Sequence, residues 1–206
     1  MHLKYAILFA LCAFFIPGSE AQTLSYLSLQ GGVFFPIRCY HSTHPDNPNA
    51  GYAKPGFKFT LQYMRSARNR LGLTAALIYF TNPVDRIYRS REKQNHYQSL
   101  ALVAGPSFFS DPRNNWHYES RLLAGIAKVL TPELRLEKGI LLPRQSVCAF
   151  TWQLEVAILK QLTPKDWLLL KADHQQLKPQ FKHSGTRKTE QHMLGIGLSP
   201  GAEYSL

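Results

Sequence analysis

Apolar and polar residues alternate along most of the chain with a period of two. Between positions 57 and 63, for example, the odd positions are aromatic or aliphatic, whereas Lys58, Thr60 and Gln62 occupy the even ones. Successive side chains of a β-strand point to opposite faces, so this alternation predicts strands with one apolar and one polar face. Eight stretches follow the pattern: 25–35, 56–65, 71–80, 96–109, 117–130, 148–159, 167–174 and 191–199.

The connections between these stretches alternate strictly in length. The long ones cover residues 36–55, 81–95, 131–147 and 175–190. The short ones cover residues 66–70, 110–116 and 161–166. A barrel that spans an outer membrane has short turns on its inner side and longer loops on its outer side. The alternation therefore predicts an all-β fold, an eight-stranded antiparallel up-and-down transmembrane β-barrel.

The first 21 residues have the composition of a secretory signal peptide. Lys4 precedes a short apolar stretch at positions 5–16, and the small residues Ser19 and Ala21 follow with the spacing of a cleavage site. The apolar stretch is shorter than the roughly 20 residues that a helix needs to cross a bilayer. We therefore expect residues 1–21 to be removed on export, and residues 22–206 to form the barrel in a Gram-negative outer membrane.

The chain is basic, with a formal net charge of +11 at pH 7. Such a charge favours anionic partners, and export argues against nucleic acid and for acidic lipid or lipopolysaccharide. Cys39 and Cys148 remain after the expected cleavage. In an oxidising compartment the two can form a disulfide, but two free thiols fit the sequence as well, and the spacing does not decide between them.

The combination of export, eight alternating strands and alternating loop lengths resembles the small outer-membrane barrels typified by the OmpA transmembrane domain and OmpX. The resemblance implies an interior filled by side chains, an internal ion network and no continuous pore. It also implies insertion by the barrel-assembly machinery. Such barrels commonly end on Phe, which that machinery recognises, whereas this sequence ends on Leu206, with Tyr204 on the same parity.

Charged residues of both signs lie opposite the apolar faces of the expected strands. An eight-stranded barrel is just wide enough inside to be filled with side chains, and buried charges must pair. We therefore expect an interior ion network. Its members are Lys58, Glu119, Arg121, Glu155, Lys171 and Asp173.

Aromatic residues cluster near the strand ends, where the girdles of a membrane barrel lie. These residues are Phe34, Phe35, Tyr79, Phe80, Phe108, Phe109, Trp116, Tyr118, Trp152 and Trp167. A soluble, lipocalin-like binding barrel would instead bury its apolar face, and alternation alone does not separate the two. The tryptophan expected in the first-strand motif of lipocalins is absent from the segment around Gly32, which favours the membrane barrel.

Two short motifs contain residues capable of chemistry. His41 and His44 form an H-x-x-H, but no further ligand cluster accompanies them, so we expect no metal and no other cofactor. His183 and Ser184 lie near Glu190, whereas barrel lipid A deacylases carry F-x-H-x-S, in which His and Ser share a face. Adjacent residues of a strand point to opposite faces. We therefore expect no enzyme, with a lipid A-modifying hydrolase as an alternative.

Two of the long connections are rich in basic residues, which we expect to lie above the outer leaflet and to contact lipopolysaccharide phosphates. A merely solubilising surface fits the same residues. The sequence thus favours a non-enzymatic outer-membrane barrel that acts through its loops. The basic residues are Arg86, Arg89, Arg91, Lys93, Lys178, Lys182, Arg187 and Lys188.

Overall fold

The computed structural model describes residues 24–43, 50–68, 70–84, 96–110, 115–136, 139–142, 144–182 and 188–206. Within these ranges the side chains of residues 67–68, 134–142, 182 and 188–190 are left out of the description. No helix in the part of the chain that the structure describes has the length and apolar character needed to cross a bilayer.

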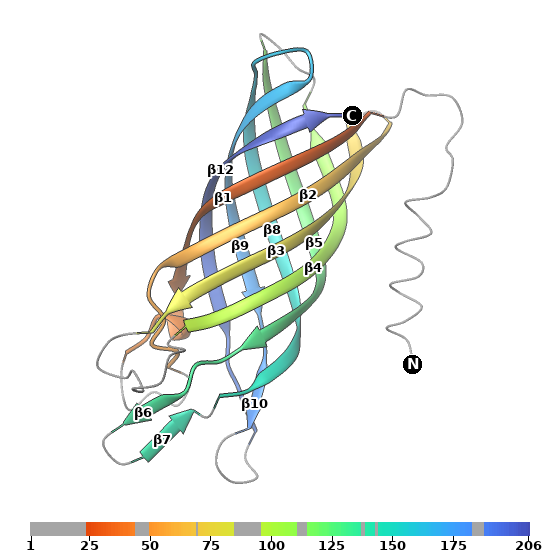
Figure 1. Cartoon of the computed structure of the whole chain (residues 1–206). Helices are drawn as coiled ribbons and strands as arrows, with labels where there is room; N and C mark the ends of the chain where they lie inside the picture. Colours follow the sequence, from red (N-terminus) through yellow and green to blue (C-terminus); the bar gives the residue numbers. More distant parts are fainter. Residues whose placement is uncertain are drawn as a thin grey trace, which may run out of the picture.

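Eight long antiparallel strands close into one barrel, in the order β1-β12-β9-β8-β5-β4-β3-β2 (Figure 1). The first and last strands pair with each other, for example at Leu27 and Tyr204, so the barrel has no free edge. Closure satisfies the backbone of every strand within the barrel, which a membrane requires. The strands are β1 (Ser25–Ile37), β2 (Gly56–Arg68), β3 (Leu71–Pro83), β4 (His96–Phe109), β5 (Trp116–Leu130), β8 (Ser146–Gln161), β9 (Asp166–Leu177) and β12 (Met193–Ser205).

The long and short connections lie at opposite ends of the barrel. In Figure 1 the short turns are at the top and the long connections at the bottom. Following the rule for outer-membrane barrels, we refer to these as the inner and outer ends. The long connections hold five short elements: η1 (Arg38–Tyr40), β6 (Leu134–Leu136), β7 (Gly139–Leu142), β10 (Gln180–Lys182) and β11 (Lys188–Glu190).

The predicted strands are confirmed in number and order, but several are longer than predicted. β9 continues to Leu177, and β12 continues through Pro200 to Ser205. Both ends remain paired with the neighbouring strand, and in β12 the apolar parity also continues through Ala202 and Tyr204, as the sequence indicates. The long connection at 131–147 was predicted as a loop, but it contains the paired strands β6 and β7.

The outer wall of the barrel is apolar. Soluble proteins rarely expose contiguous apolar patches larger than a few hundred Å², because water penalises apolar surface by about 25 cal/mol per Å². The wall therefore faces lipid, and the soluble, lipocalin-like alternative is wrong. Exposed residues around the wall include Leu61, Leu77, Leu102, Phe150 and Leu170.

The aromatic girdle is only partly as predicted. Phe35, Phe108 and Trp116 face outward, whereas Phe34 and Phe80 are buried inside the barrel. Adjacent residues of a strand point to opposite faces, so a pair of neighbouring aromatics cannot lie on one girdle. The inward members instead belong to an apolar core at the outer end.

Candidate functional site

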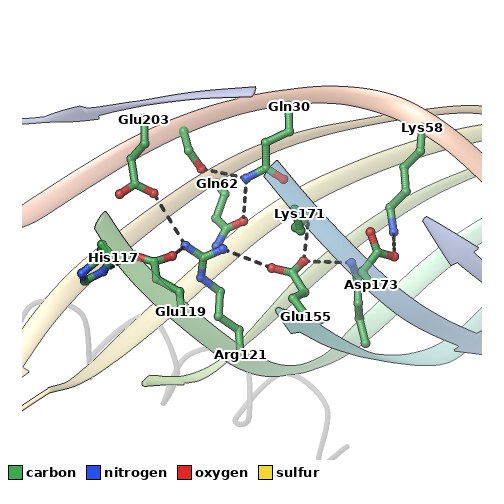
Figure 2. Close-up of polar contacts among 12 residues, drawn as sticks. Gln30, Lys58, Gln62, His117, Glu119, Arg121, Glu155, Lys171, Asp173 and Glu203 are labelled. Carbon is green, nitrogen blue, oxygen red and sulfur yellow. Dashed lines mark hydrogen bonds and ion pairs between the residues drawn. The ribbon is translucent and has the colours of Figure 1, made fainter. Parts of the chain in front are cut away.

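The inner half of the barrel interior contains an ion network centred on Arg121 of β5. Figure 2 shows its guanidinium between three carboxylates. Arg121 Nη2 pairs with Glu119 and lies 3.6 Å from Glu203 Oε2, and Nη1 lies 3.4 Å from Glu155 Oε2. All four side chains are almost completely buried. Gln62 completes the shell, because its amide oxygen, turned toward Arg121, accepts from Nε at 2.9 Å.

The network continues toward the outer end through two lysines. Lys171 Nζ lies 3.2 Å from Glu155 Oε1, on the side of that carboxylate away from Arg121. Lys58 Nζ donates to Asp173 Oδ2 at 2.6 Å and to Gln175 Oε1 at 3.0 Å. These contacts connect β2, β5, β8 and β9 across the lumen. The structure therefore brings together all six residues that the sequence singled out for the interior.

The acidic side chains of the described network outnumber the permanent cations by one. Arg121 serves three carboxylates, whereas Asp173 has its own lysine. His117, at the inner end of β5, lies 3.1 Å from Glu119 Oε1. The sequence analysis missed Glu203. Gly197 and Glu203 are both odd-numbered positions of β12, so Glu203 points into the barrel, whereas the next residue, Tyr204, points outward.

Two glycines of β12 make room for inward side chains. A Cβ atom at Gly197 would lie 2.5 Å from Asp173 Oδ1, and one at Gly195 would lie 2.1 Å from the Phe34 ring. Both contacts are shorter than van der Waals contact, so a larger residue would displace Asp173 or Phe34. The glycines of β12 are therefore needed for the interior to fill.

The outer half of the interior is apolar and is closed by the first long connection. Tyr40 and Tyr52, which flank the undescribed part of this connection, are buried together with Ala53. The Tyr40 ring lies edge-on to the Tyr97 ring, with centroids 5.3 Å apart. We call the buried part of this connection, Tyr40, Tyr52 and Ala53, the plug.

Asn82 of β3 holds the plug in place. It accepts from Tyr40 Oη at 3.2 Å and donates to the backbone oxygens of Lys54 at 2.9 Å and of Phe34 at 3.2 Å. The backbone of the connection is also paired, because Ala53 N donates to Tyr40 O at 3.1 Å. The connection that the sequence predicts as an outer loop thus turns inward. The apolar core around it meets the ion network at Phe34 of β1, whose ring lies 5.3 Å from Lys58 Nζ.

The remaining sequence candidates are dispersed. Cys39 is half-buried and Cys148 is exposed, and both are free thiols, so the disulfide that the sequence allowed is not formed. His41 Nδ1 lies 3.0 Å from Ala53 O. His44 and the pair His183 and Ser184 fall outside the described residues.

The basic loop candidates are described only in part. Lys178 is exposed at the outer end of β9, and the backbones of Lys182 and Lys188 lie in the paired strands β10 and β11. Arg86, Arg89, Arg91, Lys93 and Arg187 lie outside the described residues. Among the residues that are described, no group of three or more His, Cys, Asp or Glu side chains is arranged to hold a metal ion.

An apolar outer wall around an interior that contains a buried ion network defines a small transmembrane β-barrel. The solved structure of Neisserial surface protein A shares this fold, with a TM-score of 0.58 at 10% identity over 87% of this chain and 96% of that one. Ail of Yersinia pestis, solved with the heparin analogue sucrose octasulfate, gives 0.50 at 13% identity over 90% and 100%. No protein-family model and no curated protein sequence matches the chain.

The resemblance to small outer-membrane barrels is therefore confirmed for the fold. The shared fold and the apolar outer wall are those of an outer-membrane protein, as the sequence predicted.

Proposed function

We propose that this protein is a closed, non-enzymatic outer-membrane barrel whose basic outer connections bind the phosphates of lipopolysaccharide. One observation carries the proposal: buried side chains pack the described part of the interior, whereas the sequences of the long connections are strongly basic. The four long connections carry 13 Lys and Arg against 6 Asp and Glu. Clustered cations attract anionic lipid surfaces, and each contributes about 1 kcal/mol near such a surface.

The filled interior argues against transport as the function. A substrate crossing the lumen would have to displace the plug and separate the ion pairs around Arg121. Breaking a buried ion pair costs about 3–5 kcal/mol. The outer connections need no such rearrangement, and the described basic residues Arg38, Arg144 and Lys178 are exposed at that end.

We further propose that residues 1–21 direct export and that the barrel-assembly machinery inserts the chain. The charged start, the short apolar stretch and Ala21 support the first part. The closed barrel of antiparallel strands supports the second. Recovery of the chain beginning at Gln22 in the outer-membrane fraction tests the first part, and loss of that chain when the machinery is depleted tests the second.

Lipopolysaccharide binding is tested by titrating the folded chain in detergent with lipopolysaccharide and with its dephosphorylated form. We expect the dephosphorylated form to bind weakly, and the triple variant R86Q/R89Q/R91Q to lose affinity for the phosphorylated form by about fivefold per arginine. Lys165→Gln, at an inner turn, is the matched control. Equal affinity for the two forms would overturn the proposal.

The same incubation tests the enzymatic alternative. A fatty acid released from lipopolysaccharide by the wild type, but not by His183→Ala, would support a lipid A hydrolase instead. A hydroxyl nucleophile needs a base within hydrogen-bond reach, so loss of His183 would abolish such an activity.

A further inference from the structure

The outer wall has a hollow of about 520 Å³ across β4, β5, β8, β9 and β12. The strand register explains it. One row of outward positions runs Phe108, Ser120, Val156, Ala172, Leu198, each paired with the next on the neighbouring strand. The small Ser120 and Ala172 lie between larger side chains. The row therefore has two low positions, one on each side of Val156, between the larger Phe108 and Leu198 at its ends.

A second row closes the hollow toward the inner end of the barrel. Tyr118 pairs with Ile158, and Ile158 pairs with Leu170. All three are exposed, and all three line the hollow. The lining of the hollow is thus mostly apolar, with Ser110, Glu119 and Ser120 as its polar members. Its volume lies within the range of about 300–1,000 Å³ that is typical of ligand pockets.

A lysine lies just beyond this second row. Lys160 faces outward from the inner end of β8, where it pairs with Trp116 of β5. Its Nζ lies 5.5 Å from the centroid of the Trp116 ring. Tryptophan and lysine are the side chains that mark a membrane–water interface. We therefore place Lys160 at the level of the lipid headgroups. The hollow lies next to it, in the hydrocarbon region of the bilayer.

We propose that the hollow binds one glycerophospholipid of the inner leaflet, with an acyl chain against Ser120 and Ala172 and the phosphate at Lys160. The wall faces hydrocarbon, and an apolar hollow gains dispersion contacts only when a chain fills it. The cation at its inner end complements the charge of a phosphodiester. This inference rests on the proposed function only in that both place the barrel in the membrane.

The test is native mass spectrometry of the full folded chain after incubation with phosphatidylglycerol in detergent. We expect the wild type to retain one phosphatidylglycerol at collision energies that strip the detergent. The variant S120L/A172L fills the hollow with side chains that suit a lipid-facing wall, and it should lose this adduct. The matched control A75L/A202L enlarges two outward alanines of β3 and β12 outside the hollow and should keep it.

The headgroup contact is tested separately. Lys160→Gln should weaken retention about fivefold, the effect expected for one cation at a lipid surface. Lys128→Gln, an exposed lysine at the outer end of β5, should leave retention unchanged. No change in Lys160→Gln would overturn the placement of the phosphate.

Other results would overturn the site itself. The first is full retention of the lipid by S120L/A172L, and the second is a loss of lipid from A75L/A202L equal to that from S120L/A172L. The third is a dimer that disappears when the hollow is filled, because the occupant would then be a second copy of the chain. Titration of S120L/A172L with lipopolysaccharide separates the two proposals. If that affinity matches the wild type while the phospholipid is lost, both stand. If the wild type binds no lipopolysaccharide but retains phospholipid through the hollow, only the proposed function fails.

Discussion

Replacing Arg121 with methionine tests whether the interior is held together by charge pairing. Arg121 is 2% exposed, and its guanidinium is shared by Glu119, Glu155 and Glu203. Methionine keeps much of the volume, but of these three carboxylates it leaves only Glu155 in contact with a described lysine, Lys171. Removing one partner of a buried ion pair costs about 3–5 kcal/mol, because the other charge remains buried and uncompensated. We expect the free energy of unfolding to fall by about that amount.

The same reasoning predicts a rescue. If excess negative charge is the cause, Glu119→Gln and Glu203→Gln in the Arg121→Met background should restore more than half of the lost free energy. Replacing all partners of a buried ion cluster by neutral residues is often close to neutral for stability. Arg121→Lys should fall between the wild type and Arg121→Met, because it keeps the charge but loses the planar fork that reaches several carboxylates.

The assay is urea unfolding in lipid vesicles, followed by tryptophan fluorescence and by the heat-modifiable gel migration of the folded barrel. Lys128→Met, an exposed position on the same strand, is the control and should change the free energy by less than about 0.5 kcal/mol. A loss below about 1 kcal/mol in Arg121→Met, against the 3–5 expected, would refute charge pairing as the main effect. The same conclusion would follow if the triple variant R121M/E119Q/E203Q were no more stable than Arg121→Met.

Three further predictions concern the wall and the plug. Leu102→Lys, at a position 54% exposed on the wall, should cost about 2–4 kcal/mol in the same unfolding assay, since it places a charge in hydrocarbon. Asn82→Ala should lose the bonds to the plug, and trypsin should then cleave after Arg38, which is exposed beside Tyr40, faster than in the wild type. Two effects raise the pKa of Tyr40 well above its ordinary value of 10.0: burial, which is the larger, and the neighbouring Tyr97. The stability of the plug should therefore be constant below about pH 10 and fall as the pH rises through the pKa of Tyr40 in the folded protein. In a titration followed by tyrosinate absorbance, Tyr40→Phe should have one fewer phenol that ionises late.

The barrel wall was predictable from the sequence because most outward positions are apolar. Outward side chains such as Leu61 and Leu77 all face lipid, so apolar residues recur at every second position along each strand. The charged inward positions were predictable for the same reason, since Lys58 and Arg121 interrupt otherwise apolar stretches at a fixed parity. The particular pairs depend on register and strand order, which alternation does not specify.

The plug was not predictable, because an irregular segment has no periodic pattern. Its only trace in the sequence is a loss of alternation at the outer ends of the strands, where Phe34 is followed by Phe35, and Tyr79 by Phe80. One member of each pair faces lipid and the other faces the interior. Strand ends that are apolar on both faces therefore indicate that the connection beyond them folds inward.

A filled interior restricts where this protein can act. Among the described residues, the network around Arg121 lies in the inner half of the lumen and the plug around Tyr40 in the outer half. An eight-stranded barrel is just wide enough inside for side chains to fill it. Passage through the lumen would break buried pairs that cost several kcal/mol each, whereas the outer connections and the wall are accessible without any rearrangement. The basic connections lie at one end and Lys160 at the other. We therefore expect loss of lipopolysaccharide binding and loss of phospholipid retention to arise from different variants, because the two contacts lie at opposite ends of the barrel.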